Sequence, residues 1–254
     1  MSFLIKISAA VLIVVCAQIF AQTDVHTVRI PAGKFTRGSN DGKADEKPVR
    51  EIEISAFNMT SKEVSEAQYQ NCVNAGRCQP AHYDDGKCLQ WTGTKFINVT
   101  VPQQFRGSNL PVVCVSWLEA RAYCASIGMR LPAEAEWEYA ALGGAASARY
   151  SWGNGTPDKS RCAVSSLHNT GSFAPNGYGL YDMTGNAWEW TADFYEQDYY
   201  SYSESADPKG PNAGFYRVIR GGGFYSGPAE LRIQNRHWFS PNFAEVSVGF
   251  RCAR

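Results

Sequence analysis

The sequence predicts an α+β domain with few helices, several short strands and long loops. Segments with helical spacing of apolar residues are few, and short segments with alternating or β-type composition lie between stretches of turn-forming residues. The composition agrees, because seven tryptophans, thirteen tyrosines and 23 glycines are typical of an aromatic-rich, turn-rich protein and not of a helical bundle.

The first part of the domain is expected to be mainly extended. Residues 28–38 read as a strand, a turn and a second strand, and residues 49–57 alternate apolar and polar side chains as a half-buried strand does. Residues 62–72 have helical spacing. Residues 73–110 carry turn formers, charges and three cysteines, so we expect a loop region held by disulfides there.

Two further helices are predicted by their end signals. Residues 116–119 form a capping box, in which the serine hydroxyl accepts from the N–H three residues later and the glutamate reaches back. This helix should run to Ile127 and stop at Gly128, which tolerates a left-handed conformation. The second helix should follow Pro132 and end at residues 143–144.

The rest of the chain is expected to be loops with short strands. These strands are placed near residues 188–192, 216–221 and 248–253. The length suits one domain, and we see neither an internal repeat nor a linker.

The first 21 residues have the features of an export signal. Lys6 is the only positive charge ahead of an apolar run over residues 7–20, and Ala21 offers a small residue for cleavage. The run is shorter than the ~20 apolar residues of a membrane-spanning helix. We therefore expect a signal peptide at residues 1–21 and a domain at residues 22–254, exported to the periplasm or secreted, with no membrane span.

Charge and motif content exclude several classes of function. The 24 lysines and arginines balance the 24 aspartates and glutamates, so no nucleic-acid partner is expected. The sequence has no glycine-rich phosphate loop, no serine-hydrolase elbow and no metalloprotease motif. The four histidines are widely separated and match no metal-ligand spacing: His26, His82, His168 and His237.

Seven cysteines follow the expected signal peptide. An oxidising compartment makes disulfides the default state, and an odd number leaves one thiol. Cys72 and Cys78 are close enough in sequence to pair locally, and Cys88 with Cys114 is a second candidate pair. This scheme leaves Cys162 free, although the connectivity does not follow from the sequence.

Four patterned blocks carry a resemblance to a known family. They read RLPAEAEWEY, GLYDMTGNAWEW, RVIRGGG and GFRC, and they begin at residues 130, 179, 217 and 249. These blocks resemble the formylglycine-generating enzyme, or sulfatase-modifying factor, family over residues 28–254. The resemblance implies a C-type-lectin-like fold of that family's type. It also implies a disulfide between Cys124 and Cys252.

The resemblance further implies a calcium site in residues 182–189. Two carboxylates bracket a glycine-containing turn whose carbonyls can face the same point, and Ca²⁺ needs several oxygen ligands at once. The family's ligand positions match Asp182, Gly185, Ala187 and Glu189. The alternative is that Asp182 and Glu189 cap turns and pair with nearby arginines. We expect calcium.

A catalytic copper site is not expected. In the family, two cysteines in the turn after residues 221–223 bind copper(I), and oxygen then converts a substrate cysteine to formylglycine. Ser226 occupies the place of the first cysteine, and no sulfur follows it through Arg232. Copper(I) prefers soft thiolate ligands. The sequence therefore assigns no catalytic residue.

The resemblance places a substrate groove beside this turn. The positions expected to line it are Gly223, Tyr225, Arg232, Arg236, His237 and Trp238. We therefore interpret the chain as an exported, atypical or accessory sulfatase-modifying-factor-like protein whose groove binds a peptide, a protein partner or a small ligand. Two alternatives stay open: a divergent periplasmic oxidoreductase similar to the pyoverdine-maturation type, and a lectin-like binding module.

Overall fold

The computed structural model describes residues 25–254, so the expected signal peptide lies outside the described residues. Within this range no helix is both long and apolar enough to cross a membrane. The helices are α1 (Glu66–Asn74), α2 (Trp117–Ser126), α3 (Glu134–Leu142) and α4 (Tyr199–Tyr202), and the 3-10 turns are η1 (Ala44–Glu46) and η2 (Gln103–Phe105). The strands are β1 (Thr27–Ile30), β2 (Gly33–Arg37), β3 (Arg50–Ile54), β4 (Phe57–Thr60), β5 (Cys88–Trp91), β6 (Phe96–Val99), β7 (Trp188–Phe194), β8 (Arg217–Arg220), β9 (His237–Phe239) and β10 (Val248–Phe250).

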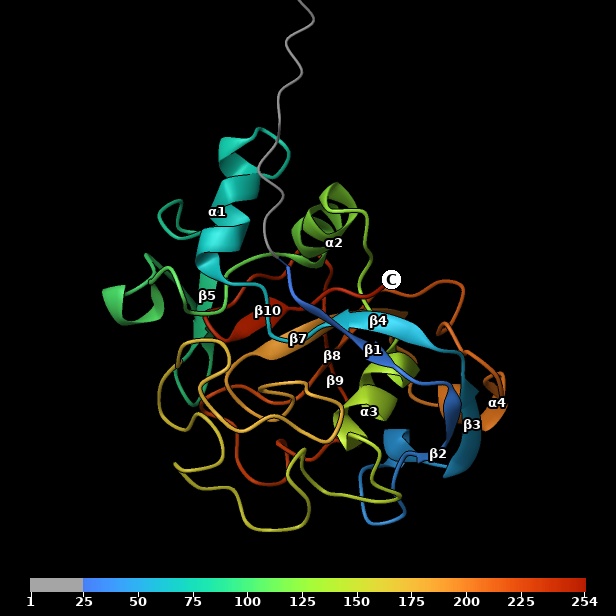
Figure 1. The fold of residues 1–254 in the computed structure, drawn as a ribbon. Helices are drawn as coiled ribbons and strands as arrows, with labels where there is room; N and C mark the ends of the chain where they lie inside the picture. The colour runs from blue at the N-terminus through green and yellow to red at the C-terminus, as the bar shows by residue number, and fades with distance from the viewer. Residues whose placement is uncertain (1–24) are drawn as a thin grey trace, which may run out of the picture.

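These short elements and long connections form the α+β fold that the sequence predicts (Figure 1). A four-stranded sheet with the order β10-β7-β8-β9 lies in the middle of the molecule. Strand β10 runs parallel to β7, and the other pairs are antiparallel. Helix α2 packs on one side of this sheet, where Tyr123 and Cys124 join an apolar cluster with Trp190 and Phe250.

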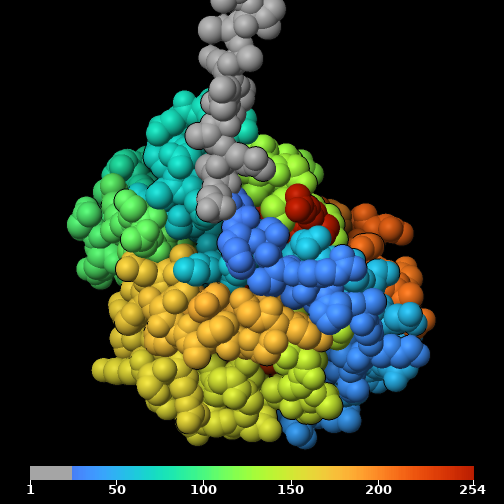
Figure 2. Space-filling view, viewed as in Figure 1, coloured from blue at the N-terminus to red at the C-terminus, as the bar shows by residue number. Residues whose placement is uncertain are grey.

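Helix α3 lies between this sheet and the N-terminal strands (Figure 1). Strand β1 pairs with β4, and β2 pairs with β3, so the two strands in residues 27–37 belong to different ladders. Ile30, Ile52 and Met59 point from these ladders into a core that includes Trp137 of α3. In the space-filling view, loop residues from about 145 to 187 form the lower front of the molecule (Figure 2).

A hairpin occupies part of the region that we expected to be a loop. Strands β5 and β6 pair antiparallel, with Trp91 opposite Phe96, and the turn between them is closed by Thr92 and Lys95. Each strand has only four residues, and β5 has one buried residue whereas β6 is almost entirely exposed, so no alternation between buried and solvated faces marks them in the sequence. The disulfide from Cys88 to Cys114 attaches this hairpin to the core.

The helix ends follow the predicted chemistry at α2 and a variant of it at α3. Ser116 Oγ accepts from the Glu119 N–H at 3.3 Å, and Glu119 accepts from the Ser116 N–H at 2.7 Å. Ala133 offers no hydroxyl at the start of α3, but Glu136 still accepts its N–H at 2.8 Å. Gly143, at a φ of 60°, ends α3 in the left-handed conformation.

The structure contains three disulfides. They join Cys72 to Cys78, Cys88 to Cys114 and Cys124 to Cys252. The third bond links α2 to the segment after β10 and spans 128 residues, whereas the first spans 6. Cys162 is the one cysteine in residues 25–254 without a disulfide, and it is buried.

The disulfide that closes the longest loop should contribute most to stability. In the chain-entropy model, removing a crosslink of 128 residues costs about 5 kcal/mol, and removing one of 6 residues costs about 2 kcal/mol. We therefore expect the double variant Cys124→Ala/Cys252→Ala to lose more unfolding free energy than Cys72→Ala/Cys78→Ala. Urea denaturation followed by circular dichroism measures both, and equal losses would contradict this expectation.

Candidate functional site

A groove separates the β5–β6 hairpin from the turn at residues 223–230. It consists of two adjoining hollows with cavity volumes of about 440 and 230 Å³, and both are lined by Trp91, Tyr225 and Glu230. The larger hollow is also lined by Gln90, Gly93, Phe224 and Val246. The smaller one adds Phe96, Trp188, His237 and Phe239.

Aromatic rings in mutual contact form one wall of the smaller hollow. Trp91 contacts Phe96 with ring centroids 4.9 Å apart, and Phe96 meets Phe239 edge-on at 5.8 Å. The row continues from Phe239 to His237 at 4.9 Å and from His237 to Trp188 at 5.5 Å. Such edge-to-face and tilted contacts fix the ring orientations, so this wall is largely rigid.

The opposite wall is Tyr225, which a buried carboxylate holds in place. The Tyr225 hydroxyl donates to Glu245 Oε1 at 3.1 Å and lies 2.9 Å from Ser247 Oγ. Glu245 Oε1 also accepts from the backbone N–H of Trp91 at 3.4 Å, so one side chain braces both walls. Burial raises the pKa of Glu245. Burial is also the main cause that raises the pKa of the Tyr225 hydroxyl, which therefore stays protonated at neutral pH.

The turn that carries Ser226 is closed by its own hydrogen bonds. Ser226 Oγ accepts from the Gly223 N–H at 3.1 Å, and the Ser226 N–H donates to the Gly223 carbonyl at 2.9 Å. A Cβ at position 223 would lie 3.0 Å from Ser247 Cβ and 3.0 Å from Trp188 Cδ1, so a larger residue there would need its neighbours to move. The serine therefore has a structural partner within the turn.

The residues near this turn do not fit copper(I). Six of the cysteines between residues 25 and 254 are in disulfides, and the seventh, Cys162, belongs to a small apolar cluster with Tyr150 and Leu231. Burial raises the pKa of the Cys162 thiol to about 11, and its Sγ lies 3.8 Å from the Asp158 carbonyl. One protonated thiol does not supply the paired thiolates that copper(I) prefers.

The six residues that we expected to line the groove lie in different surroundings in the structure. Tyr225 and His237 line it, and Gly223 lies buried in the turn beside it. Burial and nearby Lys43 lower the pKa of His237, so its ring is neutral at pH 7. Trp238 packs on Tyr195 at 5.3 Å and lines a second hollow, which shares His237 with the groove.

Neither arginine lines these two hollows, although Arg236 lines the neighbouring hollow together with His237 and Trp238. Arg232 donates two hydrogen bonds to Glu46, at 2.6 and 2.8 Å. Arg236 is 1% exposed and donates to both oxygens of Glu134, at 2.7 and 3.1 Å. Both partners are more than 100 residues away in sequence, which local spacing could not reveal. Their charges are used in holding the fold together.

Arg236 belongs to a buried ionic network centred on α3. Arg220 donates to Glu134 at 2.6 Å and to Glu138 at 2.7 Å, and Arg37 donates to Glu134 at 2.9 Å. All five side chains are almost fully buried. Burial opposes ionisation, but the three guanidinium groups lower the pKa of Glu134 to about 2. Both glutamates are therefore paired and buried.

A fully buried aspartate borders this network. Asp193 Oδ1 accepts from the Glu134 N–H at 2.9 Å, whereas Oδ2 has no hydrogen-bond partner among the described residues. Burial and the negative charge of Glu134 raise the pKa of Asp193 to about 7. The folded protein therefore binds a proton here at pH values where the unfolded chain has released it.

This proton predicts a pH-dependent effect of Asp193→Asn. Asp193 titrates near pH 4 in the unfolded chain and near 7 in the folded protein, so the wild type loses stability as pH rises between these values. The amide does not titrate. The free energy of unfolding of the variant minus that of the wild type should therefore rise from pH 4 to 7, by roughly a few kcal/mol, and level off above pH 7.

Urea unfolding at pH 4, 5.5, 7 and 8 measures this difference. Asp198→Asn is a suitable control, because Asp198 is exposed. A constant difference between Asp193→Asn and wild type over this pH range would show that Asp193 is ionised in the folded protein throughout.

The predicted calcium loop has one carboxylate with an unused oxygen. Asp182 Oδ2 accepts from the Gly171 N–H at 2.5 Å, but the buried Oδ1 has no hydrogen-bond partner in the described part of the chain. Asp182 and Gly185 have φ values of 55° and 86°, which give the loop its tight turn. Burial raises the pKa of Asp182 to about 6.

Glu189, the second expected carboxylate ligand, is already paired. Its two oxygens accept from Arg251 Nη2 and Nε, each at 2.7 Å, and Oε2 also accepts from Trp137 Nε1 at 2.7 Å. This arrangement matches the alternative in which the carboxylate pairs with a nearby arginine. A cation in the loop would have to share Glu189 with Arg251.

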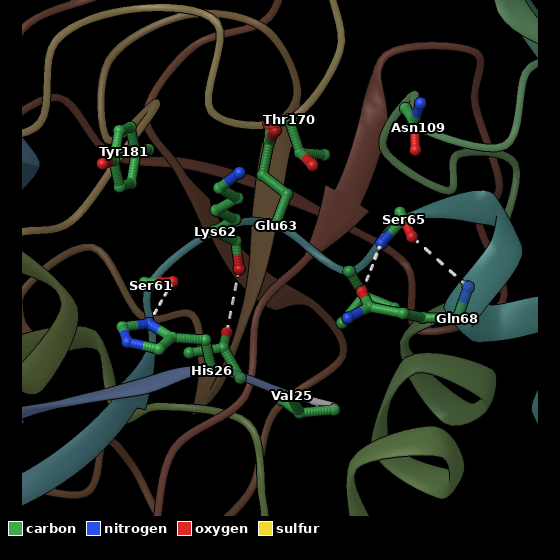
Figure 3. Close-up of a pocket in the computed structure, with 12 residues that line it drawn as sticks. Val25, His26, Ser61, Lys62, Glu63, Ser65, Gln68, Asn109, Thr170 and Tyr181 are labelled. Atoms are coloured by element: carbon green, nitrogen blue, oxygen red, sulfur yellow. Dashed lines mark hydrogen bonds between the residues drawn. The ribbon is translucent and has the colours of Figure 1, made fainter. Parts of the chain in front are cut away.

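Sequence reasoning missed Glu63, which lies against the same loop. Glu63 accepts from Asn186 Nδ2 at 2.7 Å and from the Ala187 N–H at 3.1 Å. Glu63 lines a pocket with a volume of about 400 Å³, and Figure 3 shows Lys62 and Tyr181 in the same lining. Burial, and then the charges of Asp182 and Glu189, raise its pKa well above the usual range. No local signal could have found this contact, because 123 residues separate Glu63 from Asn186.

The loop offers carboxylate and carbonyl oxygens, which are the ligand atoms that Ca²⁺ prefers. Within residues 25–254, no group of three or more histidine, cysteine, aspartate or glutamate side chains is arranged to hold a metal. A cation would therefore need backbone carbonyls, such as those of Gly185 and Ala187, in addition to Asp182. The structure leaves one buried Asp182 oxygen without a hydrogen-bond partner among the described residues, as a ligand atom of such a mixed site would be.

Known proteins with similar sequences agree with the fold. The chain is 38% identical to the serine/threonine-protein kinase pkn1 of Chlamydia caviae, over 89% of this chain but only 37% of that protein. It is 35% identical to the formylglycine-generating enzyme of Thermomonospora curvata, over 89% of this chain and 92% of that enzyme. The solved structure of PvdO from Pseudomonas aeruginosa aligns with a TM-score of 0.74 and 25% identity, covering 90% of this chain and 93% of PvdO.

A family model described as the sulfatase-modifying factor enzyme 1-like domain matches residues 17–254. The match includes the patterned blocks at residues 130–139 and 179–190, together with the turn that carries Ser226. The chain therefore belongs to the sulfatase-modifying factor family, and its fold agrees with that assignment.

Proposed function

We propose that this chain is an exported, atypical member of its family that binds a peptide or small ligand in the aromatic groove and does not make formylglycine with copper. The observation that carries this proposal is the turn beside the groove, where Ser226 bonds to Gly223 and where residues 25–254 supply no pair of free thiols. The groove itself is intact and lined by Trp91, Tyr225 and His237. Binding without the family's oxidation chemistry is consistent with this arrangement.

Export is supported by the disulfides. Three disulfides are stable in an oxidising compartment and are uncommon in a reducing cytosol. This chemistry supports the proposed periplasmic or secreted location. A peptide or protein partner encountered there is the proposed occupant of the groove, in preference to a nucleic acid.

The copper assay tests the proposed function. Purified protein, copper(I), oxygen and a cysteine-containing peptide derived from a sulfatase should give no aldehyde, because the thiolates that would hold copper are missing. Mass spectrometry of the peptide after reaction with an aldehyde-specific hydrazine detects the product. The formylglycine-generating enzyme of Thermomonospora curvata serves as a positive control, and aldehyde formation by this chain would refute the proposal.

We also propose a calcium ion in the loop of residues 182–189. Asp182 would supply the carboxylate oxygen that lacks a partner, and the carbonyls of Gly185 and Ala187 would complete part of the shell. Glu189 would contribute only by sharing its charge with Arg251. A bound cation would hold in place the loop of residues 182–189, which leads into β7.

Metal analysis and thermal unfolding test this calcium site. Dialysed protein should hold about one Ca²⁺ per chain, and calcium should raise the melting temperature because it binds only the folded loop. Asp182→Ala should abolish both effects, whereas Asp41→Ala at an exposed position should preserve them. A calcium-independent melting temperature in the wild type would rule the site out.

A second candidate function is a divergent oxidoreductase of the pyoverdine-maturation type. The backbone similarity to PvdO over 90% of this chain favours it over the lectin-like module. Its reaction would have to use the same groove, because that groove adjoins the turn at residues 223–230. The neighbouring genes distinguish the two roles, since a siderophore cluster would support oxidation and a sulfatase gene would support an accessory role.

A further inference from the structure

We propose that the smaller hollow of the groove is a binding site for an alkylated ammonium group, such as a trimethylammonium. This inference rests on the proposed function and names the chemistry of its ligand. The hollow is lined by five aromatic side chains, one neutral histidine and one carboxylate: Trp91, Phe96, Trp188, Tyr225, Phe239, His237 and Glu230.

The charges around the groove favour a cation. Over the described chain, neither hollow has a lysine or an arginine in its lining, although the protein has 24 such residues. Glu230 lines both hollows, and Glu245 lies directly behind Tyr225. Lys43 lies in the separate hollow beyond His237, where its Nζ donates to the Arg236 carbonyl at 3.4 Å. The groove is thus acidic and aromatic.

The ring lining favours an alkylated ammonium over a strongly hydrated one. Aromatic faces attract a cation through their quadrupole, and sets of such faces recognise quaternary ammonium groups in other proteins. They offer few hydrogen-bond acceptors, so a primary ammonium would lose hydration without replacement. A volume of about 230 Å³ is small compared with pockets for drug-sized ligands and suits a compact group.

The walls are held in place before any ligand binds. Glu245 bonds to the Tyr225 hydroxyl and to the Trp91 backbone, and the Cys88–Cys114 disulfide anchors the hairpin that carries Trp91 and Phe96. Trp91, Phe96 and Tyr225 nevertheless stay 38%, 38% and 41% exposed. Rings that are both fixed and accessible can bind with little loss of conformational entropy.

Choline and its uncharged analogue 3,3-dimethyl-1-butanol provide a matched test. The two have nearly the same shape and differ in the positive charge. Ligand-observed NMR titration of the purified protein should show the methyl protons of choline shifted upfield by the surrounding rings. We expect choline to bind at least about tenfold more tightly than the alcohol, which corresponds to about 1.4 kcal/mol.

Three variants locate the binding site. Trp91→Ala should abolish choline binding, and Glu230→Gln should weaken it several-fold while leaving the weak binding of the alcohol unchanged. Phe215→Ala is the control, because Phe215 is 88% exposed and lies outside the groove, and it should bind choline as the wild type does. Circular dichroism verifies that each variant is folded.

The inference fails if choline and the alcohol bind equally, if neither binds, or if Trp91→Ala binds choline normally. It also fails if unmodified lysine amide binds as tightly as its trimethylated form, since the rings would then select only charge. These outcomes leave the copper assay unaffected. Aldehyde formation in that assay would instead overturn the proposed function and leave the choline comparison valid.

Discussion

The buried ionic network on α3 is the interaction on which the rest of the fold depends. Glu134 receives hydrogen bonds from Arg37, Arg220 and Arg236, and so joins β2, β8 and the segment before β9 to one helix. Each charge is tolerated inside the protein because its partners are there too. Removing one partner would leave an uncompensated buried charge, which is far more costly than losing the pair.

The same network determines the electrostatics of the groove. Arg232 and Arg236 lie close to the groove in sequence, yet Glu46 and Glu134 draw their guanidinium groups into the interior. What remains at the surface is a set of rings with Glu230 and, behind them, Glu245. The acidic, aromatic character of the groove is therefore a consequence of how the core neutralises its own carboxylates.

The patterned blocks that identify the family are largely parts of this ionic core. Glu134 and Glu138 lie in the first block, Glu189 in the second and Arg251 in the last, where Arg251 pairs with Glu189. Trp137 connects the two sets by donating to Glu189. These residues hold the fold together, and Ser226 lies outside the four blocks.

Local chemistry in the sequence determined the α+β class and the helix ends. The capping box at residues 116–119, the left-handed stop at Gly143 and the family blocks act over a few residues, so they can be read directly. Only the tertiary structure decided that β5 and β6 form a groove wall, that Glu63 lies against the 182–189 loop and that Arg232 turns inward to Glu46. Those contacts join segments far apart in the chain, and they depend on which buried charges find partners, a property that residue spacing does not encode.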